Sequence, residues 1–157
     1  MRYERGMDAP RLLVSAGLVW LAHDRLLLGR RSPDAEHGAR ALEFPGGKVE
    51  RREDPRAALV RELAEEWGPG AARLAIGPIA EVLHHVYPSP GPEVVLCLFH
   101  VDARVLQDDW RAALQPLPGA AIEAYVRAAL PVEQFLAADR PFAATLRGGA
   151  LRCPFPD

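Results

Sequence analysis

The stretch from Gly46 to Gly68 constrains the fold most, because it joins a glycine turn to a helix with clear ends. Asp54 and Pro55 are a strong helix start, with the aspartate as N-cap and the proline at the first helical position. Gly68 is followed by a proline, so the pair supplies a C-terminal cap and prevents continuation. We therefore predict a helix over Arg56–Trp67.

The two faces of this helix differ in chemistry. Glu62, Glu65 and Glu66 stand at i, i+3 and i+4 and share one side of the helix. The opposite, apolar side is predicted to pack on a sheet, and it comprises Leu59, Val60, Leu63, Ala64 and Trp67. Three carboxylates on one stripe repel one another. A hard cation such as Mg²⁺ or Mn²⁺ would explain the stripe, and a solvated acidic surface is the alternative.

The longer spacing around the helix favours the metal site. This spacing resembles the Nudix box, G-x5-E-x7-R-E-U-x-E-E-x-G-U, where U is a bulky apolar residue. The seven fixed letters are matched by Gly47, Glu53, Arg61, Glu62, Glu65, Glu66 and Gly68. With this chain's composition, such a match has a chance on the order of 10⁻⁸ at any one start. Pro69 departs from the pattern at the last position, where an aliphatic residue is usual.

The resemblance extends beyond the box to the MutT-like branch of the Nudix hydrolases. It is carried by Leu42–Lys48, by Leu28–Arg31 and by Leu136–Pro141, and it spans about residues 12–147. The implied fold is the α+β (α/β) Nudix fold, an αβα sandwich around a curved mixed β-sheet. Residues 120–130 are rich in alanine and favour a helix by propensity, whereas the resemblance implies a strand there.

The remaining elements follow from apolar runs and turn residues. The chain shows no repeat or composition break, so we expect residues 1–10 to be a flexible arm and 11–157 to be a single domain. Expected strands are Leu12–Leu21, Arg25–Arg31, Ile79–Tyr87 and Glu93–Asp102. Ser32–Arg40 is expected to be a surface loop, Glu43–Lys48 an interruption of regular structure, and Pro131–Ala138 a short helix.

Composition excludes several classes of protein. The net charge of −2 gives no attraction to a nucleic-acid polymer. No apolar run reaches the roughly 18–20 residues of a membrane helix, and no secretory signal begins the chain. Two cysteines are too few for a disulfide framework. We therefore expect a cytoplasmic protein with no nucleic-acid polymer and no membrane as partner. The family resemblance implies a nucleotide substrate, and we expect a monomeric or homodimeric state.

The family resemblance implies the chemistry. Nudix hydrolases cleave a nucleoside diphosphate linked to another group, by attack of water at phosphorus with a divalent metal. The MutT-like branch converts a nucleoside triphosphate or deoxynucleoside triphosphate to the monophosphate and pyrophosphate, which suits removal of oxidised or modified nucleotides. Hydrolysis of ADP-ribose or of dinucleoside polyphosphates is the alternative. A catalytically silent nucleotide sensor is disfavoured, because such domains lose box glutamates and this chain keeps them.

The resemblance also assigns metal ligands. Glu62, Glu65 and Glu66 would bind Mg²⁺, or alternatively Mn²⁺, together with the carbonyl oxygen of Gly46. One of these glutamates would orient or deprotonate the attacking water, with Glu62 as first choice and the other two as rivals. Glu123 is a candidate late metal ligand or base, and a surface carboxylate is its alternative interpretation.

Arg61 and Glu53 are expected to form a structural ion pair that ties the glycine loop to the helix. The family's catalytic set therefore maps here onto five side chains. These are Glu53, Arg61, Glu62, Glu65 and Glu66.

Four residues are candidate substrate contacts: Arg31, Phe44, Lys48 and Asp139. Phe44 could pack on a base or in the core, and Arg31 could reach phosphate or stay exposed. Asp139 matches a position that is Asn or Asp in relatives. An aspartic acid presents both a donor and an acceptor only when protonated, which burial favours. Residues 80–93 contain no arginine, which weakens specificity for 8-oxo-guanine.

Histidine and cysteine are interpreted as structural. His84 and His85 are neighbours and point to opposite faces of a strand, so at most one lines a given site. His100 is likewise taken as structural or solvent-facing, and Cys97 as a core thiol within an apolar run.

Overall fold

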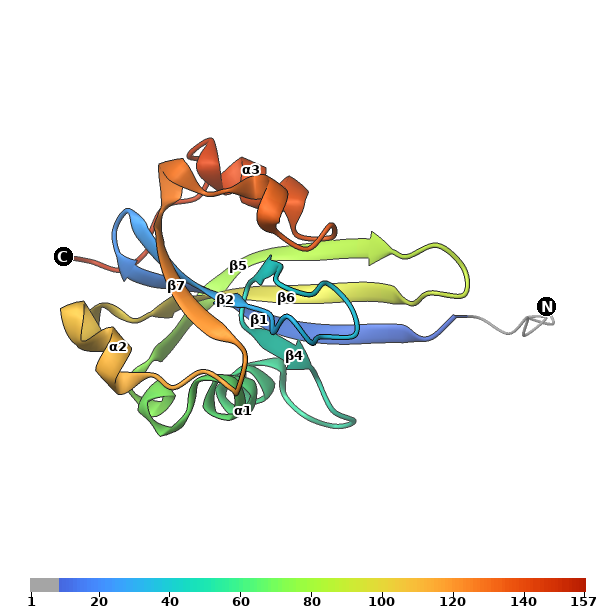
Figure 1. Ribbon diagram of the computed structural model, residues 1–157, viewed down its shortest axis with the longest axis horizontal. Helices are drawn as coiled ribbons and strands as arrows, with labels where there is room; N and C mark the ends of the chain where they lie inside the picture. The colour runs from blue at the N-terminus through green and yellow to red at the C-terminus, as the bar shows by residue number, and fades with distance from the viewer. Residues whose placement is uncertain (1–8) are drawn as a thin grey trace.

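The computed structural model describes residues 9–157, and Figure 1 shows how the elements are arranged. The strands are β1 (Arg11–Ala22), β2 (Arg25–Arg30), β3 (Leu42–Glu43), β4 (Gly46–Lys48), β5 (Ala75–Val86), β6 (Glu93–Asp102) and β7 (Ala121–Val126). The α-helices are α1 (Pro55–Trp67), α2 (Trp110–Ala113) and α3 (Arg140–Arg147). Short 3₁₀ turns are η1 (Pro69–Arg73), η2 (Arg104–Asp109), η3 (Arg127–Ala129) and η4 (Val132–Gln134).

The sheet is mixed, as predicted. Its main path runs β3-β2-β1-β6-β5, and β7 pairs with β2 on the other side. The β1–β6 pair is parallel and the other pairs are antiparallel. β1 pairs with β2 only near their shared turn, as far as Val19 and Leu27. Farther from that turn, β1 pairs with the short strand β4, and β2 pairs with the short strand β3. The glycine turn is therefore held in the middle of the sheet.

Helices cover both faces of the sheet, which confirms the predicted sandwich (Figure 1). The alternation along β1 produces two cores, because successive side chains point to opposite faces. Val19 packs in the core under α1 with Leu63. Leu18 and Trp20 pack in the core under α3 with Phe142.

The ends of α1 agree with the prediction. The Asp54 carboxylate accepts hydrogen bonds from the backbone N–H groups of Arg56 (2.8 Å) and Ala57 (3.1 Å), as an N-cap does. The helix ends at Trp67, and Gly68 follows with φ of +79°. Pro69 then begins the 3₁₀ turn η1, so the chain continues in a tighter helix for one turn.

The buried stripe of α1 is narrower than predicted. Its buried residues are Ala58, Leu59, Leu63 and Trp67. Val60 is 54% exposed and Ala64 is exposed, so the prediction was wrong for these two. Packing against a single sheet buries the row of residues at i, i+4 and i+8, here Leu59, Leu63 and Trp67. Val60 and Ala64 each follow a residue of this row, so they lie farther around the helix and face solvent.

The short helix predicted over residues 131–138 was wrong. Only Val132–Gln134 form a 3₁₀ turn, and the helix α3 begins later, at Arg140. Phe135 instead bridges to Leu42 of β3, and the Leu136 N–H donates to the Leu42 carbonyl at 3.0 Å. These sheet-like bonds replace the helical ones. The buried Phe135 side chain gives this arrangement its apolar anchor.

Three further strand assignments can be compared with the prediction. Residues 121–126 form a strand along β2, as the family resemblance implied against alanine propensity. The interruption predicted over residues 43–48 contains β3 and β4, so it was wrong in part. Strand β5 begins at Ala75, four residues before the predicted start, with a register shift on the way.

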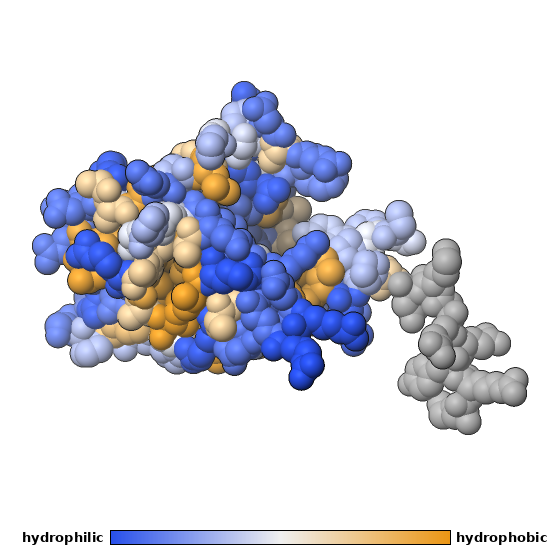
Figure 2. All heavy atoms as spheres, turned by 90° about the horizontal axis from the view of Figure 1, so that it is seen from below, coloured by the Kyte–Doolittle hydropathy of each residue, from blue (hydrophilic) through white to orange (hydrophobic). Residues whose placement is uncertain are grey.

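The predicted N-terminal arm lies outside the described residues up to position 8. Within the part that the structure describes, the Pro10 carbonyl accepts a hydrogen bond from the Glu93 N–H at 3.1 Å. No helix among residues 9–157 has the length and apolarity needed to cross a bilayer. Figure 2 views the molecule from below, where a hydrophilic surface surrounds smaller apolar areas.

Candidate active site

The glycine turn has room for glycine only. Gly46 has φ of +154°, and a Cβ there would lie 2.0 Å from the Ser15 carbonyl oxygen of β1. A Cβ on Gly47 would lie 2.4 Å from the carboxyl carbon of Glu62. The turn therefore packs against the sheet on one side and against a carboxylate of α1 on the other.

The predicted ion pair between Arg61 and Glu53 is present. Two guanidinium nitrogens of Arg61 each donate to one Glu53 oxygen at 2.9 Å. A further hydrogen bond of 3.0 Å runs from Arg61 to the Lys48 carbonyl, so α1 is tied to β4. The Arg61 guanidinium, with the Glu50 N–H, lowers the pKa of Glu53 to about 2. This carboxylate is therefore ionised across the physiological range.

Arg61 also contacts two of the box glutamates. It donates to Glu62 at 2.8 Å and to Glu65 at 3.4 Å. The Glu65 side chain is 59% exposed, whereas that of Glu62 is 16% exposed. Glu53 and Glu62 both raise the pKa of Arg61, so the guanidinium stays charged at the centre of this cluster.

Glu66 is a half-buried member of the acidic stripe that contacts the glycine turn. Its carboxylate accepts a hydrogen bond from the Gly46 N–H at 3.3 Å. Burial, together with the nearby carboxylates of Glu43 and Glu62, raises the pKa of Glu66 to about 8, against the opposing effects of the Gly46 N–H and the Arg31 guanidinium. Closely spaced acidic groups with too little positive charge are an arrangement that a cation would stabilise.

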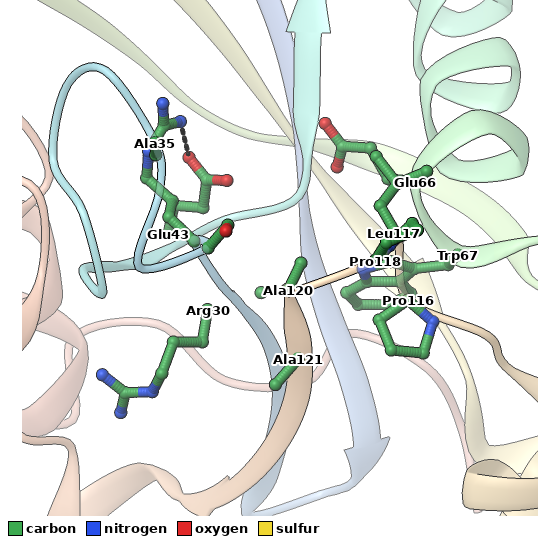
Figure 3. Close-up of a pocket in the computed structure, with 13 residues that line it drawn as sticks. Arg30, Ala35, Glu43, Glu66, Trp67, Pro116, Leu117, Pro118, Ala120 and Ala121 are labelled. Carbon is green, nitrogen blue, oxygen red and sulfur yellow. Dashed lines mark hydrogen bonds and ion pairs between the residues drawn. The ribbon is translucent and has the colours of Figure 1, made fainter.

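A cavity of about 270 Å³ opens beside Glu66. Figure 3 shows Glu43 and Glu66 on opposite sides of it, with the dashed ion pair of Glu43 marked. That pair is formed with Arg31 at 3.0 Å. Ala121 at the start of β7 and several loop residues also line the wall, namely Ser32, Ala35, Pro116, Leu117, Pro118 and Ala120. The cavity therefore offers both carboxylates and guanidinium groups to a ligand.

The donor set fits Mg²⁺ or Mn²⁺ by chemistry, because Glu62 and Glu66 bring carboxylate oxygens to the Gly46–Gly47 turn from one helix face. In the described part of the chain, no three His, Cys, Asp or Glu side chains converge closely enough to hold an ion as they stand. Glu62 and Glu65 are turned toward Arg61 instead. Binding of an ion by these carboxylates would therefore need their side chains to turn toward it.

Glu123 lies apart from the acidic stripe. It stands on β7 opposite Leu28, on the face of the sheet that carries α3. Its carboxylate forms an ion pair with Arg30 and accepts a hydrogen bond from the Tyr125 hydroxyl at 2.7 Å. Its role as a metal ligand stays a prediction. Sequence reasoning missed Arg30, although the alternation of β2 turns it to the face opposite Arg31.

The substrate candidates lie in different environments. Phe44 is 5% exposed and packs between Phe135 and Phe142, with ring centres 5.5 and 5.6 Å away, which favours the core interpretation. Lys48 is exposed. Arg31 is held by its ion pair with Glu43. Their roles in substrate binding stay predictions.

Asp139 is a buried carboxyl at the start of α3. It is 7% exposed, and burial, together with the charge of Glu43, raises its pKa to about 7. A small cavity beside it is lined by Leu83, His85, Val94, Leu96 and Ala138. The environment therefore keeps Asp139 largely protonated below neutral pH, as the sequence argument required for a combined donor and acceptor.

The histidines behave as interpreted. His85 faces the cavity of Asp139, whereas His84 contacts Glu93 at 2.8 Å. The register opposes them to adjacent residues of β6, so they point to opposite faces. His100 is buried and accepts a hydrogen bond from the Trp20 indole at 2.9 Å, which is a structural role. Cys97 is a free, partly buried thiol packed against the core under α1.

Comparison with known proteins now gives the family. The model of the NUDIX domain matches residues 11–147, which is most of the 157-residue chain. The chain therefore belongs to the Nudix family.

Among curated proteins, the chain is similar to the 8-oxo-dGTP diphosphatase of Escherichia coli K12. The two are 45% identical over 58 residues, which is 37% of this chain and 44% of the relative. The 8-oxo-dGTP diphosphatase of Proteus vulgaris is 42% identical over 62 residues, or 40% of this chain and 54% of the relative. The chain thus spans about half the length of the curated relatives it matches.

Solved structures show the same fold over nearly the whole chain. The MutT protein of Methanosarcina mazei Go1 superposes with a TM-score of 0.65 at 19% identity, covering 92% of this chain and 99% of the other. The E. coli ORF135 protein gives a TM-score of 0.64 at 22% identity, covering 90% and 92%. At such identities the likeness concerns the fold alone.

Proposed function

We propose that this chain is a divalent-metal-dependent hydrolase that converts a nucleoside triphosphate and water to a nucleoside monophosphate and pyrophosphate. The observation that carries the proposal is the meeting of Glu62 and Glu66 with the Gly46–Gly47 turn. These groups are held by the ion pair of Arg61 with Glu53. The similarity to two 8-oxo-dGTP diphosphatases supports a triphosphate substrate.

The proposed metal ligands are Glu62, Glu65, Glu66 and the Gly46 carbonyl, with Mg²⁺ as the preferred ion and Mn²⁺ as an alternative. A divalent ion held there would neutralise phosphate oxygens and lower the pKa of a bound water. Glu62 is the proposed base that receives the proton of the attacking water. Its side chain is largely buried and lies directly over the turn, where a phosphate chain can approach bare backbone.

Other residues position these groups. Arg61 binds Glu53, Glu62 and the Lys48 carbonyl together, so it fixes the distance between α1 and the turn. Phosphoryl transfer depends mainly on positioning and charge stabilisation. For that reason, we expect Arg61 to matter for turnover although it need not touch the reacting phosphorus.

The base would lie near Asp139, with Arg31 beside the cleft and Phe44 behind its wall. A protonated Asp139 offers one donor and one acceptor, and an ionised one offers only acceptors. Both forms are accessible near neutral pH, because the pKa of this carboxyl is about 7. The curated relatives favour an oxidised purine, whereas the absence of arginine in residues 80–93 weakens specificity for 8-oxo-guanine.

The test is pyrophosphate release with Mg²⁺ or Mn²⁺ from the common nucleoside and deoxynucleoside triphosphates, 8-oxo-dGTP and 5-methyl-dCTP. ADP-ribose and diadenosine tetraphosphate complete the set. We expect activity on triphosphates that falls by about 10²-fold or more in Glu65→Gln. Glu133→Gln, at an exposed carboxylate on η4, is the matched control. Preference for ADP-ribose or the dinucleotide would overturn the substrate, and tight binding without turnover would indicate a sensor.

A further inference from the structure

Two neighbouring arginines at the end of β2 hold the same loop from opposite sides of the sheet. Arg31 donates from Nε to the His37 carbonyl at 3.0 Å. Arg30 donates from Nη1 to the Arg40 carbonyl at 2.7 Å. Ser32 and Ala35 of this loop line the cavity beside Glu66. The loop of residues 32–40 is therefore a wall of the candidate cleft, and both arginines restrain it.

Arg30 is itself fixed by three side chains. Its Nε forms an ion pair with one Glu123 oxygen, and its Nη2 donates to the other at 3.1 Å. The Tyr125 hydroxyl donates to Glu123 at 2.7 Å and accepts from Arg30 at 3.1 Å. Gln134 accepts a fourth hydrogen bond at 2.8 Å. Both oxygens of Glu123 are thus engaged within a partly buried network, since the Arg30 and Glu123 side chains are 24% and 30% exposed.

The network also controls the segment that carries Asp139. Gln134 begins this segment, and two residues later the Leu136 N–H bonds to β3. A Cβ on Gly38 would lie 2.3 Å from the Leu136 side chain, so the loop and the segment pack directly on each other. Movement of Arg30 would therefore displace the loop and the segment together.

We propose that Glu123 is a positioning residue, which acts through Arg30 to hold loop 32–40, a wall of the cleft, and segment 134–139, which carries Asp139, and that it does not bind the metal ion. The substrate and metal parts rest on the proposed function, whereas the loop part does not. A bidentate arginine–carboxylate pair needs the charge and the planar fork of both partners. Glu123→Gln and Arg30→Lys should consequently loosen loop 32–40 to the same extent.

The first measurement is Mn²⁺ affinity of the full chain without nucleotide, by electron paramagnetic resonance. We expect Glu123→Gln to bind Mn²⁺ within about twofold of wild type. Glu66→Gln should bind it about tenfold or more weakly, as the loss of a carboxylate ligand predicts. Glu133→Gln is the control for removing a charge from the neighbouring exposed surface.

The second measurement is hydrogen exchange of the backbone amides of residues 32–41, followed by mass spectrometry. Both Glu123→Gln and Arg30→Lys should raise the exchange of this peptide by about tenfold, because a charge-assisted hydrogen bond is lost. The double variant should show little more than either single change, since both remove one interaction. Amides of α1 should exchange as in wild type.

Substrate kinetics supply the third measurement. We expect Glu123→Gln and Arg30→Lys to raise KM more than they lower kcat. Tyr125→Phe keeps the ion pair of Arg30 with Glu123 and removes the two hydrogen bonds of the hydroxyl. It should therefore give a smaller change, and it serves if the other variants fail to fold.

The proposal would be overturned by Mn²⁺ binding in Glu123→Gln as weak as in Glu66→Gln, or by loop exchange equal to that of wild type. If the wild-type chain hydrolyses no nucleotide, the proposed function fails. The exchange results still decide the role of Glu123 in holding the loop.

Discussion

The buried carboxyl of Asp139 should make folding stability depend on pH in a defined direction. Its pKa is about 7 in the folded chain, against 3.8 for an exposed aspartate. Between these values the folded carboxyl keeps its proton and the unfolded one has lost it, so folding takes up a proton. The free energy of unfolding contributed by this group therefore falls as pH rises from about 4 to about 7, and stays low above that.

The size of the effect follows from the same two values. A difference of about 3 in pKa corresponds to about 4 kcal/mol, at 1.36 kcal/mol for each unit. Asp139 is only 7% exposed, so solvent screening reduces this figure little. Asn has nearly the same shape and never ionises. Hence Asp139→Asn should equal wild type near pH 4 and exceed it by up to about 4 kcal/mol at pH 8.

The assay is urea unfolding of wild type and Asp139→Asn between pH 4 and 8 in the presence of a chelator. Asp34→Asn, at an exposed position in loop 32–40, is the matched control and should not change the pH dependence. Other titrating groups are common to both proteins and cancel in the difference. A stability difference that stays constant across this range would refute the reasoning, because it would mean that Asp139 ionises at its ordinary pKa.

Three further outcomes follow from the turn, the ion pair and the proposed metal. Gly46→Ala should lower the free energy of unfolding, measured with a chemical denaturant, by about 3 kcal/mol or more, because the new Cβ would collide with the backbone of β1. Gly47→Ala should instead displace the Glu62 side chain, so we expect a larger effect on kcat than on the melting temperature. Glu53→Gln should lower the melting temperature at pH 7, and this difference should vanish as pH falls from 4.5 toward 2, where wild-type Glu53 becomes protonated. Chelation should abolish hydrolysis, and added Mg²⁺ or Mn²⁺ should restore it; activity that survives chelation would contradict the proposed metal dependence.

Features encoded in neighbouring residues could be predicted from the sequence. The ends of α1 depend on Asp54 and Gly68, whose capping geometry is local. The ion pair between Arg61 and Glu53 joins residues eight positions apart at the spacing that the box fixes. Alternation along a strand was enough to separate His84 from His85.

Features that depend on contacts between residues far apart in the sequence could not be predicted from it. The residues near 131–138 do not indicate that Phe135 pairs with Leu42, which lies more than ninety positions earlier. Local propensity favoured a helix over residues 131–138. Val60 was predicted to be a core residue, but it is exposed. Its burial depends on how far the sheet extends under α1, and the sequence near Val60 does not contain that information. In each case tertiary packing overrode a local preference.

The same distinction applies within the site. The box describes how α1 presents carboxylates to the turn, and this geometry lies within about twenty residues of chain. The network around Arg30 is assembled from β2, β7 and the segment before α3, and its main contact joins Arg30 to a carboxylate 93 positions away. Arg31 lies beside Arg30 in sequence but turns to the other face, toward Glu43. One dipeptide therefore contacts Glu43 on one face of the sheet and Glu123 on the other. If the proposed function holds, changes at position 30 should alter substrate choice while leaving metal binding intact.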